Sequence, residues 1–157
     1  MSRVFFWVLF VAARAAAQSI CDTPRMKSLI ISCSANKLPG SHRALDLYQA
    51  RQFKIARQLQ DRGWTVFVLS AKHGLISGSD LIADYDQKMD RSRAAELANQ
   101  LPATFPAGPV YVYGGKLYRD VVKSWADRLG QQQPHELIGR NRGNGDHYRA
   151  LAALIDF

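Results

Sequence analysis

Three short polar clusters along the chain combine a lysine with small residues, and each directly follows an apolar run. Small residues let backbone N–H groups approach a ligand closely, and a lysine ammonium supplies a positive charge. The clusters therefore predict a site for an anion such as a phosphate, although a solvated lysine is the commoner outcome for any single cluster. The candidate phosphate- or ligand-binding residues in them are Ser34, Lys37, Ser70, Lys72, His73, Gly74, Gly115, Lys116 and Tyr118.

Cys33 is the first candidate for a catalytic residue. A neighbouring cation such as Lys37 favours the nucleophilic thiolate, and His42 or His73 would serve as its base. The alternative is a small cysteine that packs against a helix. The cysteines and histidines are scattered without the spacing of zinc ligands, so we expect no metal site, and the sequence indicates no particular cofactor.

Asp86 is the second catalytic candidate, and together with Asp84 it flanks Tyr85 in a loop. Two carboxylates at this spacing can bind a metal, orient a sugar hydroxyl or act as a base. They are equally suited to capping the helix that is expected to follow, or to pairing with Lys72 and Lys116.

Arg140 and Arg142 lie in a glycine-rich loop before the last expected helix. Arginines in such a loop are candidates for contacts to the phosphates of a nucleic acid. Asp146, further along the same segment, is a natural N-cap for that helix.

Strand-like and helix-like segments alternate along the chain and must position these residues. Four apolar, β-branched or aromatic runs predict strands, the last of them weakly, over Ser28–Ser32, Thr65–Ser70, Pro109–Gly114 and His135–Gly139. Helical periodicity predicts helices over Ala44–Arg62, Ser92–Leu101, Leu117–Leu129 and His147–Ile155. The alternation predicts an α/β fold, a three-layer Rossmann-like domain with a mostly parallel sheet of about four strands. Ligands of such domains bind beyond the carboxyl ends of the strands, where the three lysine clusters would meet.

The basic character of the chain is compatible with a phosphate-bearing partner. The chain has 157 residues and a formal net charge of +8. A positive surface attracts polyanions at long range. Neither a P-loop nor a G-x-G-x-x-G dinucleotide motif is present, so the expected phosphate site belongs to neither of those classes.

The first 25 residues have the composition of a secretory leader or of an upstream segment that precedes the true start at Met26. We favour the second interpretation, in which residues 26–157 form a single α/β domain. Because Cys21 falls in the doubtful segment, the domain has Cys33 alone and no internal disulfide, as expected in the cytoplasm. Secretion is the alternative if the leader is genuine. We expect no membrane partner, and the sequence indicates no oligomeric state.

Several of these motifs together resemble a known family. The matching residues are Ile31-Ser32-Cys33-Ser34 with Lys37, Leu69-Ser70-Ala71-Lys72-His73-Gly74-Leu75, Tyr85-Asp86, Gly115-Lys116 with Tyr118, and Ile138-Gly139. From about Met26 to the end, the chain resembles domain-of-unknown-function family 6884 of bacteria and phages, which is distantly similar to YaaA-like proteins. The resemblance implies an intracellular α/β domain associated with nucleic-acid or nucleotide chemistry. An Asn/Gly-rich insertion after Arg140 departs from the family pattern.

The expected function follows from these observations. We expect a protein that binds a nucleotide or a nucleic-acid phosphate and that modifies a base or a nucleoside glycosyl bond. The alternative is a non-catalytic DNA-binding or stress-related protein, whose binding would weaken steeply with salt.

Overall fold

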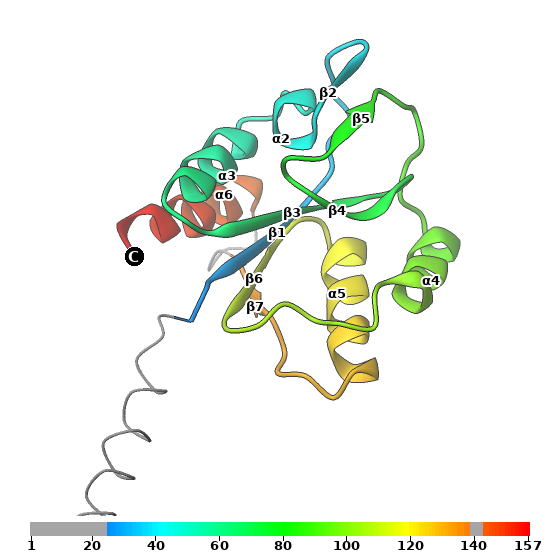
Figure 1. Ribbon diagram of the computed structural model, residues 1–157, viewed down its shortest axis with the longest axis vertical. Helices are drawn as coiled ribbons and strands as arrows, with labels where there is room; N and C mark the ends of the chain where they lie inside the picture. Colours follow the sequence, from blue (N-terminus) through cyan, green and yellow to red (C-terminus); the bar gives the residue numbers. More distant parts are fainter. Residues whose placement is uncertain (1–24, 139–142) are drawn as a thin grey trace, which may run out of the picture.

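A computed structural model describes residues 25–138 and 143–157 of the chain. Residues 1–24 and the predicted nucleic-acid contacts Arg140 and Arg142 lie outside the described residues. The described chain forms a mixed α/β fold around one main sheet (Figure 1).

The main sheet has five strands in the order β4-β3-β1-β6-β7. β1 (Ser28–Ser32) is central and runs parallel to β3 (Thr65–Ser70) on one side and to β6 (Val110–Tyr113) on the other. β7 (His135–Glu136) pairs parallel with β6, whereas β4 (Gly74–Ser77) pairs antiparallel with β3. The predicted α/β class with a mostly parallel sheet is therefore confirmed, with five strands in the place of about four.

The central strand is apolar because both of its faces are covered. All five residues of β1 are buried. Leu29 and Ile31 point into one hydrophobic core, and Ile30 points into the other. A strand buried on both faces reads as a continuous apolar run, which is how this segment was recognised in the sequence.

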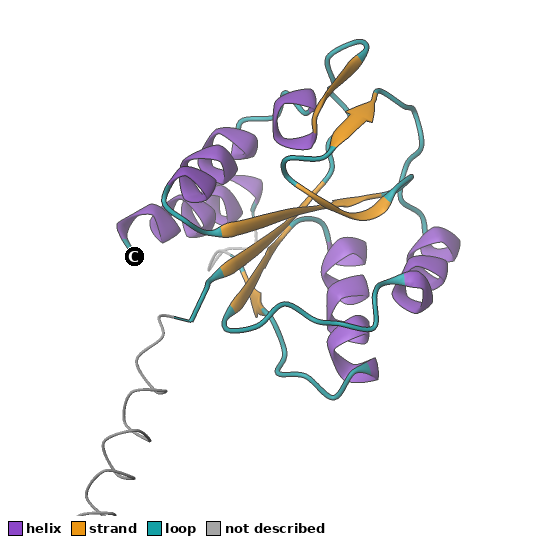
Figure 2. Ribbon diagram, viewed as in Figure 1, coloured by secondary structure: helices purple, strands orange, loops and turns teal. Residues whose placement is uncertain are grey.

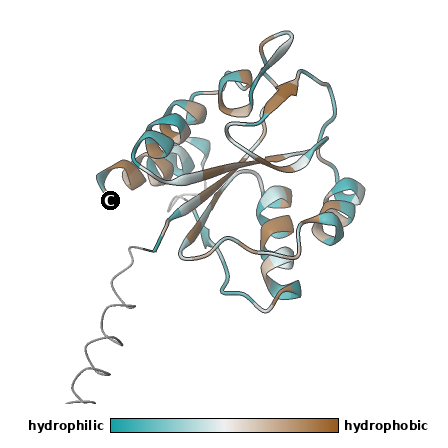
Figure 3. Cartoon of the chain, in the orientation of Figure 1, coloured by the Kyte–Doolittle hydropathy of each residue, from teal (hydrophilic) through white to brown (hydrophobic). Residues whose placement is uncertain are grey.

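Helices cover both faces of the sheet (Figure 2). One core lies between the sheet and three helices, namely α2 (Ala44–Leu47), α3 (Gln52–Asp61) and α6 (Asn144–Ala152), the last of which continues into the 3₁₀ turn Ala153–Asp156. The other core lies under α4 (Arg91–Gln100) and α5 (Lys116–Arg128). In Figure 3 the central strands are largely hydrophobic, while the helices carry both hydrophobic (brown) and hydrophilic (teal) residues. Within the described ranges, no helix combines the length and apolar character needed to cross a membrane.

The helix predicted over Ala44–Arg62 is wrong in one respect, because the structure divides it into α2 and α3. Tyr48 ends α2 in an extended conformation and forms an antiparallel bridge with Lys37. The backbone of Leu38 donates to the carbonyl of Leu47, and that of Gln49 donates to Asn36. The loop after β1 thus supplies backbone partners that replace the helical ones, which periodicity alone does not reveal.

A small second sheet was not predicted. It pairs β2 (Ser41–Arg43) antiparallel with β5 (Leu81–Ala83), and Figure 1 shows it apart from the main sheet. Just beyond β5, the backbone N–H of Asp84 donates to the carbonyl of Gly40 at 3.0 Å, and the Asp84 carboxylate accepts from the backbone N–H of Gly40 at 3.3 Å. This ribbon fixes the start of the loop that carries Tyr85 and Asp86.

Candidate functional site

The direction of the chain changes between β1 and β6 at the carboxyl edge of the sheet. β1 leads to α2 and α3 on one face, and β6 leads to α5 on the other face. Such a reversal leaves a crevice between the two strand ends, where open α/β sheets usually bind ligands. A cavity of about 600 Å³ lies there, and we call it the switch-point cavity. Its walls include Ser32, Arg51, Tyr113, Gly114, Gly115, Lys116, Arg119 and His147.

The ends of β1 and β6 approach closely because residue 114 is glycine. A Cβ atom on Gly114 would lie 2.6 Å from Ser32 Cβ and 2.7 Å from Ser32 Oγ. Ser32 is only 7% exposed as a residue, and its hydroxyl makes no hydrogen bond to a described residue. The hydroxyl is not among the fully buried polar atoms, and Ser32 lines the cavity. Ser32 thus presents an unused hydroxyl at the wall of the cavity.

Helix α5 begins at this wall. Gly115 is its N-cap and provides no side-chain hydrogen bond. The first backbone N–H groups of a helix have no acceptor within the helix and carry a partial positive charge. Amides in this position favour a bound anion.

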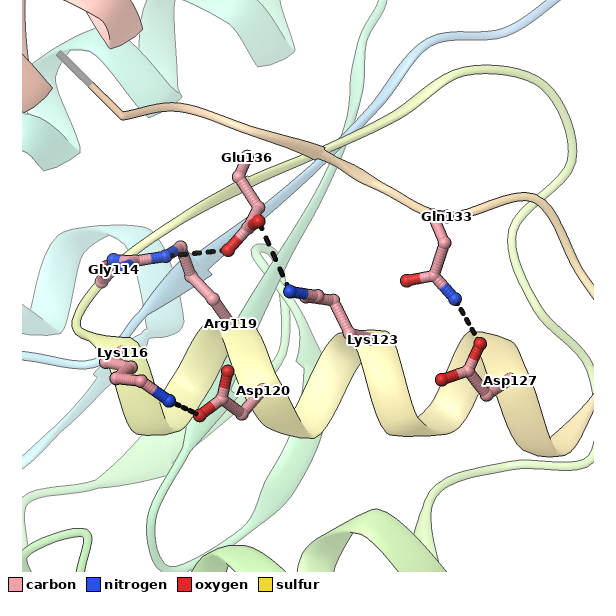
Figure 4. A network of polar contacts seen from close by, with 8 residues as sticks. All are labelled: Gly114, Lys116, Arg119, Asp120, Lys123, Asp127, Gln133 and Glu136. Atoms are coloured by element: carbon pink, nitrogen blue, oxygen red, sulfur yellow. Dashed lines mark hydrogen bonds and ion pairs between the residues drawn. The ribbon is translucent and has the colours of Figure 1, made fainter. Parts of the chain in front are cut away.

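Arg119 holds the turn that precedes α5. Its Nη1 donates to the Gly114 carbonyl at 2.6 Å, and its Nε donates to Glu136 Oε1 at 3.0 Å. The Glu136 carboxylate also pairs with Lys123 at 3.4 Å, and Lys116 pairs with Asp120 at 2.5 Å (Figure 4). Most of the positive charge on this side of the cavity is therefore balanced within the protein.

Arg51 is the cation of the opposite wall. Its guanidinium lies 4.2 Å from the centre of the Tyr148 ring and has no carboxylate partner among the described residues. Burial raises the pKa of the neighbouring Tyr113, while the charge of Arg51 acts in the other direction. Arg51 is thus a positive charge that a ligand can use.

A smaller cavity of about 210 Å³ adjoins the first, and we call it the cysteine cavity. Both catalytic candidates, Cys33 and Asp86, line it together with Ser34, Lys37, Lys88 and Tyr118. Cys33 Sγ lies 3.1 Å from Tyr118 Oη, so the thiol and the phenol share a hydrogen bond. Burial raises the pKa of Tyr118, and its contact with Cys33 does so further, which keeps the phenol protonated near neutral pH.

Tyr85 is the centre of a hydroxyl network next to the cysteine cavity. Its Oη lies 2.7 Å from Ser70 Oγ and 2.7 Å from Tyr48 Oη. Ser70 Oγ accepts hydrogen bonds from the backbone N–H groups of Lys72 and His73. Since these bonds occupy both lone pairs, the Ser70 hydroxyl must donate to Tyr85. Burial is the main cause that raises the pKa of Tyr85 and Tyr48, so both remain neutral.

Two of the predicted lysines converge on Tyr85. The ammonium of Lys37 lies 4.3 Å from the centre of the Tyr85 ring, and that of Lys72 lies 5.9 Å from it. The His73 ring contacts the same tyrosine edge-on at 5.3 Å between centroids. Desolvation and the charge of Lys72 lower the pKa of His73, which is therefore neutral at pH 7. The structure thus brings Cys33, Lys37, Lys72, His73 and Asp86 to one region.

Comparison with protein families shows which family the part of the chain with these two cavities matches. A model described as "Family of unknown function (DUF6884)" matches residues 29–148. The chain belongs to this family. Neither a curated protein nor a solved structure matches the chain significantly.

The span shared with DUF6884 contains every residue named above for the two cavities and for the Tyr85 network. The resemblance to domain-of-unknown-function family 6884 is thus confirmed. The geometry of the cavities, rather than a described relative, must indicate what this DUF6884 domain binds.

Four predicted site residues lie elsewhere or have other contacts. Lys116 and Gly115 line the switch-point cavity and are separated from the other lysine clusters. Gly74 begins β4 with a left-handed φ of 74°, and a Cβ there would lie 3.5 Å from Leu97, so its position is explained by the turn. Ser34 donates to the nearby carbonyl of Asn36 at 3.2 Å. In the described part of this DUF6884 domain, no three His, Cys, Asp or Glu side chains are grouped to hold a metal ion.

Sequence reasoning missed several residues of the site. Tyr85 was noted as the residue between two carboxylates and as part of a family motif, but not as a site residue, and Tyr48 lay within the helix predicted over Ala44–Arg62. Arg51 was placed inside the long helix, although its position at the break between α2 and α3 directs it to the cavity. Ser32 was seen as the end of a strand, and its polarity at a buried position was the available signal.

Proposed function

We propose that this protein binds a nucleotide or nucleic acid through a phosphate in the switch-point cavity, and that Cys33 and Asp86 act on the base or glycosyl bond held beside it. One observation carries the phosphate assignment. The cavity combines the Ser32 hydroxyl, which makes no hydrogen bond to a described residue, the start of α5 without a side-chain cap, and the Arg51 guanidinium, which has no ion pair to a described residue. None of the described residues that line it is a carboxylate.

A phosphate fits this donor set better than a neutral ligand does. Hydroxyl, amide and guanidinium groups are all donors to an anionic oxygen, and bonds of this type are stronger than neutral ones. A neutral ligand would leave the Arg51 charge and the partial charge of the helix start uncompensated. Carboxylates are absent from the described lining, which removes the repulsion that a phosphate would otherwise meet.

The cysteine cavity provides the reactive groups of the proposal. Tyr118 stands between the cavities, because a Cβ on Gly115 would lie 3.9 Å from its ring while its hydroxyl reaches Cys33. A nucleotide with its phosphate in the switch-point cavity would extend its nucleoside toward this pair. In that arrangement Tyr118 orients the Cys33 sulfur. For cleavage of the glycosyl bond, the sulfur attacks C1′ of the sugar and forms a C–S bond while the bond from C1′ to the base breaks, and the Asp86 carboxylate takes the thiol proton and passes it to the leaving base. Water then hydrolyses the C–S bond and returns the thiol.

The architecture and the cysteine content support two further parts of the proposal. The strand order, with a reversal between β1 and β6, is of the kind found in Rossmann-like three-layer domains, and we assign the chain to that group. Cys33 is a free thiol, which suits a reducing compartment, so we assign the protein to the cytoplasm.

Calorimetric titration with a nucleoside, its 5′-monophosphate and inorganic phosphate tests the phosphate assignment. We expect the monophosphate to bind more tightly than the nucleoside. Arg51→Ala removes a charged hydrogen bond and should weaken monophosphate binding by about 10- to 100-fold. Lys54→Ala is the matched control, since Lys54 is exposed in the first turn of α3, the helix that follows Arg51, and lines neither cavity. Equal binding of nucleoside and monophosphate, or equal effects of the two substitutions, would contradict the assignment.

Product analysis separates catalysis from the non-catalytic alternative. We expect mass spectrometry to detect a changed base or a cleaved glycosyl bond after incubation of the wild type with nucleotides or oligonucleotides. Cys33→Ser and Asp86→Asn should abolish the product. A wild type that binds without forming any product would favour the DNA-binding alternative.

A further inference from the structure

A second group of uncompensated positive charges lies beside the cysteine cavity. The ammonium groups of Lys37 and Lys72 both approach the Tyr85 ring, at 4.3 and 5.9 Å from its centre. Neither ammonium has an ion pair or a hydrogen bond to a described residue. Lys88 lines the same cavity and likewise has no ion pair within the described ranges.

An anion between these cations would relieve the repulsion between them. Like charges near one ring repel each other, and water screens this repulsion in part because Lys72 is exposed. The face of a tyrosine ring compensates an ammonium only partly. By contrast, Lys116 and Lys123 on α5 each pair with a carboxylate. Lys37 and Lys72 therefore differ from the structural lysines of the same edge.

The Cys33–Tyr118 pair lies between two positive regions, which are the lysine pair at Tyr85 and the switch-point cavity with Arg51. A chain of contacts runs from Lys37 and Lys72 to Tyr85, and Cys33 contributes to the raised pKa of Tyr85. Cys33 then bonds to Tyr118, whose ring lies beside Gly115 at the wall of the switch-point cavity. An anion at the lysines and an anion in the switch-point cavity would thus lie on opposite sides of the reactive thiol.

From this arrangement we infer that the ligand is a single-stranded nucleic acid, with one phosphate in the switch-point cavity and a neighbouring phosphate at Lys37 and Lys72. The inference rests on the proposed function, because it takes the first phosphate from there. The phosphates of a nucleoside diphosphate are joined directly and have no nucleoside between them. Consecutive phosphates of a strand enclose one nucleoside, which places that nucleoside at Cys33.

Aromatic side chains near both phosphate positions agree with a single strand. Tyr113 lines the switch-point cavity, and the Tyr148 ring contacts Arg51 of its wall. The Tyr85 ring lies near both lysine ammonium groups. Proteins that bind single strands combine a positive groove with aromatic rings on which bases stack.

Binding measured by calorimetry with three probes tests the inference. The probes are thymidine 5′-monophosphate, thymidine 3′,5′-bisphosphate and the tetranucleotide dT4. We expect the bisphosphate and dT4 to bind at least about tenfold more tightly than the monophosphate, with a steeper dependence on salt, since each added phosphate contact releases further counterions. In Lys72→Ala this preference should shrink about tenfold, and Lys54→Ala should keep the wild-type preference. Lys72 is exposed, so its substitution leaves the fold intact.

Each outcome of this experiment has a distinct meaning. A preference for bisphosphate and dT4 that Lys72→Ala diminishes supports the inference. Equal affinity for all three probes overturns the two-phosphate inference while the proposed function stands. A preference for dT4 that is the same in Lys72→Ala and wild type also overturns it, because the second phosphate would then lie elsewhere. Binding of none of the probes overturns the proposed function together with the inference.

Discussion

Substituting Gly114 by alanine should damage both the fold and the phosphate site. The new Cβ would meet Ser32 Cβ at 2.6 Å and Ser32 Oγ at 2.7 Å, and it would lie 3.4 Å from Tyr118 Cβ. Non-bonded Cβ atoms in proteins essentially never come within 3.0 Å of another heavy atom, so the first two distances are clashes. Ser32 belongs to the central strand and cannot move away. Overpacking of this kind costs about 1–3 kcal/mol of unfolding free energy, which lowers the Tm by roughly 3–10 °C in a domain of this size.

Gly115→Ala provides the matched control. A Cβ at that neighbouring position would lie 3.9 Å from Tyr118 Cδ2, which is an ordinary contact, and the backbone angles at Gly115 suit any residue. We expect calorimetry of the two variants to show a clearly lower Tm for Gly114→Ala and only a smaller decrease for Gly115→Ala, since alanine is less favourable than glycine at an N-cap. Monophosphate affinity should fall about tenfold or more in Gly114→Ala, because the strand ends that form the cavity must separate. Equal melting temperatures and equal affinities in the two variants would refute the reasoning.

Three further predictions concern the hydroxyl network and the turn before α5. Ser70→Ala leaves two backbone N–H groups and the half-buried Tyr85 without their partner, so urea unfolding should show a loss of about 1–3 kcal/mol in the free energy of unfolding. The exposed Ser79→Ala should lose about 0.5 kcal/mol or less. Above pH 10 an unfolded tyrosine ionises while the half-buried Tyr118 stays protonated, so the free energy of unfolding falls as the pH rises. In Tyr118→Phe the total fall between pH 9 and 11 should be smaller by about 1.4 kcal/mol, and an unchanged fall over that range would disprove the burial argument. Arg119→Ala removes the hydrogen bonds to the Gly114 carbonyl and to Glu136, so the free energy of unfolding should fall by about 2 kcal/mol and monophosphate affinity should fall with it. A variant that loses stability but keeps full affinity would show that Arg119 does not position the turn for the ligand.

The parallel core of the fold was predictable because its strands are buried on both faces. β1 and β3 have the predicted bounds, since continuous apolar runs indicate strands of this kind. β4 was missed because Gly74–Ser77 is short and pairs at an edge, where burial imposes little pattern. The break at Tyr48 was missed because its cause is a partner distant in sequence, the loop at Lys37.

The candidate site was predictable only in part. Its location at the carboxyl edge followed from the fold class, and the convergence of Lys37 with Lys72 followed from the parallel pairing of β1 and β3. The expectation that Lys116 joins them did not allow for the reversal of direction after β6, which carries it to a different cavity. Tyr85 enters the site through the unpredicted β2–β5 ribbon, so no local pattern could assign it there.

The walls of the switch-point cavity come from β1, from the start of α3, from the β6–α5 turn and from α6, which are distant along the chain. A partly unfolded form in which α6 has detached keeps its strands but no longer has a complete cavity. A ligand that needs the complete cavity binds only the form in which α6 is packed. It therefore stabilises that form by mass action, and the added free energy grows with the logarithm of the ligand concentration. Amide hydrogens whose exchange requires α6 to detach should exchange more slowly when the ligand is present, and their positions would mark the segments of the chain that open together.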